Sequence, residues 1–69
     1  MTRLERIRQA TRKALALGAA PGLAQKILLS SLGEEGTRVL EKRFQALLDT
    51  LPPEVGLDER MELARMVWG

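Results

Sequence analysis

Apolar residues recur at intervals of three and four along this chain, which is the spacing of one face of an α-helix. The clearest row is Leu40, Phe44, Leu47, Leu48 and Leu51, and an earlier face consists of Leu4, Ile7, Thr11, Ala14 and Leu15. Residues that favour strands are scarce, whereas Leu, Ala, Arg and Glu favour helices. The pattern predicts one all-α domain over residues 1–69, a compact bundle of about four short helices at roughly 3–17, 21–32, 35–51 and 59–68.

Capping and breaking residues mark the ends of these helices. Thr2 and Glu5 have the spacing of a capping box, in which the hydroxyl accepts a hydrogen bond from a backbone N–H of the first turn. Gly18 suits the left-handed conformation that ends a helix, and Pro21 suits the first position of the next helix. Asp58 is expected to cap the last helix, because a carboxylate accepts hydrogen bonds from its free N–H groups.

Two helices carry more apolar surface than a small bundle buries on one side. Leu29 projects from the polar side of the helix at 21–32. In the helix at 59–68, Met61, Ala64, Val67 and Trp68 are expected to face inward, which leaves other large side chains outside. The candidates for a protein interface are Leu29, Leu63, Met66 and Trp68. The alternative is that residues 21–32 form the central helix of the bundle and are buried on most sides.

The length of the chain strengthens the case for a partner. A core of this size supplies only about 3–5 kcal/mol, and small proteins usually add a disulfide, a metal or another subunit. The sequence contains no Cys and no His, which excludes disulfides and thiolate or imidazole metal sites. We therefore expect a homodimer, or a complex with another protein.

The charge is unevenly distributed along the chain. Residues 1–33 carry six basic residues and one acidic residue, and residues 34–69 carry five basic and eight acidic ones. Nucleic acid is therefore an alternative partner, since basic side chains bind phosphates. The candidate phosphate contacts are Arg3, Arg6, Arg8, Arg12 and Lys13. The same residues also suit an ordinary solvated helix face, because helical spacing places them on both sides of the apolar row.

A degenerate helix-turn-helix at about 23–45 would add base contacts, because the second helix of that motif enters the major groove. Arg38, Lys42 and Gln45 share one side of that helix and are the candidate base readers. Glu34 counts against this interpretation, since it stands where the motif has an apolar residue. An ordinary helical hairpin is the alternative.

Catalytic side chains are few in this sequence. It has no His, Cys or Tyr, and its Ser and Thr residues have no neighbouring base to activate them. No Gly-rich phosphate loop and no apolar run long enough for a membrane span occurs. We expect no catalytic residue, no cofactor, no metal, no small-molecule substrate and no membrane partner, in a cytoplasmic protein. The predicted function is a small non-enzymatic regulatory or adaptor protein that acts through protein–protein contacts.

Overall fold

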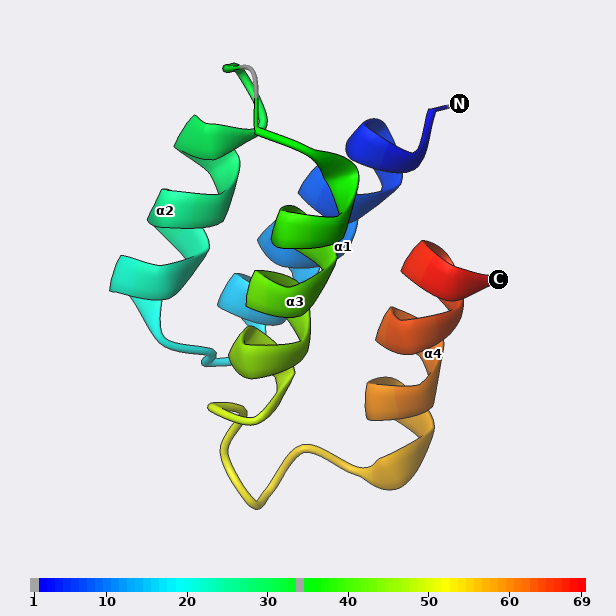
Figure 1. Cartoon of the computed structure of the whole chain (residues 1–69). Helices are drawn as coiled ribbons and strands as arrows, with labels where there is room; N and C mark the ends of the chain where they lie inside the picture. Colours follow the sequence, from blue (N-terminus) through cyan, green and yellow to red (C-terminus); the bar gives the residue numbers. More distant parts are fainter. Residues whose placement is uncertain (1, 34) are drawn as a thin grey trace.

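The computed structural model describes residues 2–33 and 35–69, and within them it contains four α-helices and no strand. They are α1 (Arg3–Ala16), α2 (Pro21–Ser30), α3 (Thr37–Leu48) and α4 (Leu57–Trp68). The prediction of an all-α bundle of four short helices is confirmed (Figure 1). None of the described helices combines the length and the apolar character needed to cross a lipid bilayer. Glu34, which bears on the helix-turn-helix interpretation, lies outside the described residues.

Helix α1 occupies the centre of the bundle and packs against each of the other three helices. Figure 1 shows α2 on one side of α1, α4 on the other, and α3 in front, with the chain reversing direction from each helix to the next. The inward side of α1 is fully buried and includes the small side chains Ala10 and Ala14, which let the neighbouring helices approach closely. The alternative that residues 21–32 form the central helix is wrong.

Helix α3 supplies more of the large core side chains than any other helix. The predicted row of Leu40, Phe44, Leu47, Leu48 and Leu51 is buried along its whole length. The row on α1 is buried at Ile7, Thr11 and Ala14 but ends in Leu15, which is 37% exposed. The Thr11 hydroxyl donates a hydrogen bond to the Ile7 carbonyl oxygen at 2.6 Å, so this buried polar group is satisfied within its own helix.

Three of the predicted helix ends are confirmed. The Thr2 hydroxyl oxygen accepts a hydrogen bond from the Glu5 N–H at 3.2 Å, and Pro21 is the first residue of α2. Gly18 has a φ of +102°, in the left-handed region that favours glycine. A Cβ at this position would lie 2.9 Å from Cγ of Pro52, so the turn between α1 and α2 is pressed against the segment that follows α3.

The other helix ends differ from the prediction because the chain closes with tighter local bonds. Helix α2 ends at Ser30, since the N–H groups of Leu32 and Gly33 bond to carbonyls three residues back. Helix α3 begins at Thr37 and ends at Leu48, where the same tightening follows. Helix α4 begins at Leu57, so Asp58 lies inside the first turn and Gly56 takes the cap position. The prediction that Asp58 caps this helix is wrong.

Arg60 fixes α4 to the preceding segment. Its guanidinium donates hydrogen bonds to the carbonyl oxygens of Val55 at 3.2 Å and Pro52 at 2.9 Å. Longer bonds reach the carbonyl oxygens of Leu48 and Leu51, both at 3.4 Å. One planar, permanently charged group therefore satisfies carbonyls at the end of α3 and in the following loop. These bonds connect the first turn of α4 to the end of α3 and to the loop between the two helices.

Candidate protein-contact face

Helix α4 carries two rows of apolar side chains. The row that packs against the core consists of Leu63, Met66 and Val67. The second row consists of Leu57, Met61, Ala64 and Trp68, at spacings of four, three and four residues. In this second row Leu57 is 70% exposed, Met61 50% and Trp68 40%. We call it the α4 face. It is a continuous apolar stripe on one side of a helix, the form in which helices usually pack against other helices.

The orientation of α4 corrects the predicted interface. Leu63, predicted to lie in the interface, is fully buried, so the prediction is wrong for this residue. Met66 is partly buried against the core, and Met61, expected to face inward, is half exposed. The helix is rotated by about one residue step, roughly 100°, from the predicted orientation. Val67 is buried as expected.

The rotation of α4 has a tertiary cause. Both rows have helical spacing, so neither is excluded by the sequence pattern. The buried row lies against α1, where Lys13 forms an ion pair with Glu62 at 2.6 Å. Leu57 and Met61 are exposed apolar residues that were not among the predicted interface residues. Their signal was the spacing of four, three and four that continues through Ala64 to Trp68.

Trp68 joins the α4 face to α3. Its ring packs against the Phe44 ring with centroids 5.7 Å apart and planes inclined by 51°, a favourable aromatic arrangement. The exposed part of Trp68 borders a shallow groove of about 450 Å³. The other residues that line this groove all belong to α3 and are Arg38, Glu41, Lys42 and Gln45. Trp68, expected to face inward and also considered as an interface residue, is thus partly exposed, and the Phe44 ring packs against its inner side.

Leu29 lies far from this face. It is 61% exposed on α2, as the sequence pattern predicts. Figure 1 places α2 and α4 on opposite sides of α1. Leu29 and Trp68 are therefore not part of one surface, and the four residues predicted as an interface do not come together.

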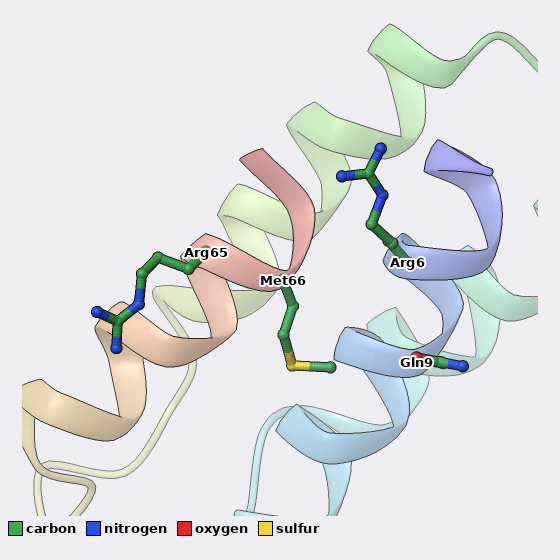
Figure 2. Close-up of a pocket in the computed structure, with 4 residues that line it drawn as sticks. All are labelled: Arg6, Gln9, Arg65 and Met66. Carbon is green, nitrogen blue, oxygen red and sulfur yellow. The ribbon is translucent and has the colours of Figure 1, made fainter. Parts of the chain in front are cut away.

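A smaller hollow of about 300 Å³ lies at the seam between α1 and α4. It is lined by Arg6, Gln9, Arg65 and Met66. Figure 2 shows the Met66 side chain directed into the seam, while the side chains of Arg6, Gln9 and Arg65 extend in other directions. The polar groups do not converge on a common point, so this hollow lacks the arrangement of a specific ligand site.

The basic residues of α1 do not form one surface. Arg3 pairs with Glu41 of α3 at 3.3 Å, and Lys13 pairs with Glu62 of α4. Arg8 and Arg12 line another hollow on α1, of about 290 Å³, together with Glu5 and Gln9. Two of the five predicted phosphate contacts are thus paired with acids from other helices, and two more lie beside an acid.

Arg38, Lys42 and Gln45 share one side of α3, as the sequence pattern predicts. They line the groove beside Trp68, and Glu41 stands among them. Arg8 and Arg12 line a different hollow. The structure therefore does not bring these two arginines of α1 into the groove with the candidate base readers of α3.

The ion pair of Lys13 and Glu62 influences one titration. A hydrogen bond from Lys13 and its positive charge lower the pKa of the Glu62 carboxyl, with a smaller contribution from Arg65. The pair links α1 to α4 on the surface, where solvent weakens such interactions. It favours the observed rotation of α4 without making a large contribution to stability.

Within residues 2–33 and 35–69, no three acidic side chains lie close enough together to hold a metal ion. The feature of the described surface best suited to recognition is the α4 face with its neighbouring groove. Comparison with protein-family models, with curated protein sequences and with solved structures found no match for this chain.

Proposed function

We propose that this chain is a small non-enzymatic regulatory or adaptor protein that binds protein through the α4 face. The observation that carries the proposal is the exposed row of Leu57, Met61, Ala64 and Trp68. Folded monomers rarely leave a continuous apolar surface uncovered unless it takes part in binding. Met and Trp are also enriched in protein interfaces.

The contacts that hold both ends of α4 in the folded bundle support the same proposal. Arg60 holds the start of the helix to loop carbonyls, and Phe44 supports the ring of Trp68 near its end. Binding through a preorganised helix costs less conformational entropy than binding through a flexible segment. A partner helix can lie along the face without first ordering it, and the aromatic ring of Trp68 offers a central apolar contact.

A photo-crosslinking residue tests this proposal. It replaces Met61 in one version of the chain and Leu29 in a matched control, since both side chains are at least half exposed. We expect protein adducts at position 61, with the purified chain or in extracts of the source cells, and far fewer at position 29. An equal yield at both positions, or no adduct at position 61, would overturn the proposal.

A second candidate function is nucleic-acid binding in the groove on α3. The observation that favours it is the arrangement of Arg38, Lys42 and Gln45 beside the exposed part of Trp68. Basic side chains next to an aromatic ring provide phosphate contacts together with a surface on which bases stack. Glu41 weakens this arrangement, because it adds a negative charge to the groove.

Duplex and single-stranded DNA titrations at several salt concentrations test the second candidate. If it is correct, Arg38→Glu with Lys42→Glu abolishes binding, whereas Arg8→Glu with Arg12→Glu has a smaller effect. Binding should also fall steeply with salt, by roughly one unit of log–log slope for each phosphate contacted. Absence of binding at low salt, or equal loss in both variants, argues against a site on α3.

A further inference from the structure

The α4 face has a symmetry that indicates what covers it. Its spacing of four, three and four residues reads the same from either end of the helix. A second α4 running in the opposite direction therefore presents the same row in register. In that register Leu57 of each copy meets Trp68 of the other, and Met61 meets Ala64. The central layers then pair a long side chain with a small one, which is how helix surfaces interdigitate.

The charges beside the face fit the same arrangement. Asp58 and Arg65 are both exposed, seven residues apart on the same margin of the row. Neither forms an ion pair with any residue that the structure describes. In an antiparallel pair of α4 helices, Asp58 of each copy comes beside Arg65 of the other. Two opposite-charge contacts form at once, and such contacts fix the register and direction of paired helices.

In a parallel pair of α4 helices, the side-chain sizes are not complementary in this way. It brings identical levels of the two helices together, with Trp68 near Trp68 and Met61 near Met61. The large and small side chains then fall in separate layers, which pack less closely. The antiparallel direction is therefore the one for which both the apolar row and the flanking charges are complementary.

We propose that the occupant of the α4 face is a second copy of this chain, docked antiparallel through Met61 and Ala64 at the centre. This inference rests on the proposed function, because it names the partner of the same surface. The two copies are related by a two-fold axis that passes between the two α4 helices at the level midway between Met61 and Ala64, so each residue of the face is used twice.

Sedimentation velocity and light scattering of the purified chain, from micromolar to millimolar concentration, provide the test. We expect a reversible monomer–dimer equilibrium. Trp68 is the only tryptophan, so its fluorescence reports on the contact. Its emission should shift to longer wavelength on dilution, as the ring becomes accessible to water. Met61→Glu should abolish the dimer, whereas Leu29→Glu, an exposed position on α2, should leave it unchanged.

A charge exchange tests the direction of the helices. Asp58→Arg alone and Arg65→Asp alone should each weaken the dimer by roughly tenfold or more, because each places two like-charge pairs in contact. The double variant D58R/R65D should restore most of the affinity, since it recreates both opposite-charge pairs. All of these positions are exposed, so the variants should keep the helical content of the original chain, as measured by circular dichroism.

Three outcomes overturn the proposal. They are a monomer at every concentration, a dimer that Met61→Glu leaves intact, and a double charge variant that fails to recover affinity. The proposed function can be separated from this inference. If position 61 crosslinks to a different protein while the chain itself stays monomeric, protein binding through the α4 face stands and self-association is wrong.

Discussion

Helices α2 and α4 flank the same central helix and both expose large apolar side chains, but they expose them differently. On α2 the exposed Leu29 stands opposite the buried Ala24 and Ile27, and its neighbours Gln25 and Lys26 are polar. On α4 the exposed side chains form a row along the whole helix, beside a second row that is buried. The exposed fraction of Leu29 lies between those of Met61 and Leu57 on α4, so exposure alone does not distinguish the two helices.

The difference lies in continuity. Leu29 has one exposed apolar neighbour, Leu32, which lies in the turn after α2, so no row runs along α2 itself. Scattered exposed leucines are common on protein surfaces and need no partner. A row at helical spacing offers a partner helix several contacts at once, which is what a stable interface requires. Helix α2 therefore covers one side of the core, whereas α4 has one apolar side on the core and a second apolar side that is exposed.

The largest expected effect separates the buried row of α4 from the exposed residue of α2. Leu63→Ala removes a fully buried side chain, so it should lower the free energy of unfolding by about 2–5 kcal/mol. Leu29→Ala should change it by less than about 0.5 kcal/mol. Urea unfolding followed by circular dichroism, at one fixed protein concentration, measures both. Similar losses would mean that the two helices are not packed as described.

The next effect concerns the segment that leads into α4. Arg60→Met keeps the apolar stem but removes the hydrogen bonds to the loop carbonyls, leaving these acceptors without their donor. We expect a loss of roughly 1–3 kcal/mol in the free energy of unfolding. Arg12→Met, at an exposed position on α1, is the matched control and should change little. A loss no larger than in the control would remove Arg60 as the group that fixes α4.

Two glycines near the start of α2 should respond in opposite ways to an added side chain. Gly18→Ala places a Cβ 2.9 Å from Pro52 in a left-handed backbone, so it should cost about 1–2 kcal/mol. At Gly22, in the first turn of α2, a Cβ meets nothing within 4 Å. Gly22→Ala should therefore stabilise the chain by about 0.4–1 kcal/mol. Thermal unfolding of the two variants should shift in opposite directions, and shifts of the same sign would contradict this account.

The smallest effect compares Lys13, which reaches α4, with Lys26 on α2. Lys13 lowers the pKa of Glu62, so the pair stabilises the folded state when Glu62 is ionised. This contribution is present above the ordinary glutamate pKa and is lost as the pH falls through the lowered folded value. Lys13→Met should raise the Glu62 pKa toward its ordinary range, measured by NMR titration. Lys26→Met is the control and should leave this titration unchanged.

Sequence reasoning predicted the fold well where local chemistry decides it. The row from Leu40 to Leu51 has one apolar side, so its burial could be predicted from spacing alone. Thr2, Gly18 and Pro21 mark helix ends through interactions within a few residues, and the structure has them at those ends. Helix ends at Ser30 and Leu48 were missed by two and three residues, because the last turns tighten through bonds that spacing does not encode.

The candidate site was less predictable because α4 is apolar on two sides. Leu63 with Val67 and Met61 with Trp68 have equally good helical spacing, and local sequence gives no reason to bury one pair rather than the other. The choice depends on contacts with α1 and α3, including the ion pair from Lys13 and the ring of Phe44. These partners lie far away in the sequence, so the rotation of α4 is a property of the assembled bundle.

The way α4 is attached has a consequence for how the bundle opens. Helices α1, α2 and α3 all contact one another, whereas α4 packs mainly along one side of α1. The least costly partial unfolding is therefore release of α4 alone, and native-state deuterium exchange should find its amide protons exchanging faster than those of α1 and α3. When α4 is released, Leu63 and Val67 become exposed to water together with the α4 face. In the proposed dimer, a second copy bound to α4 would oppose this local unfolding and so keep these apolar side chains from water.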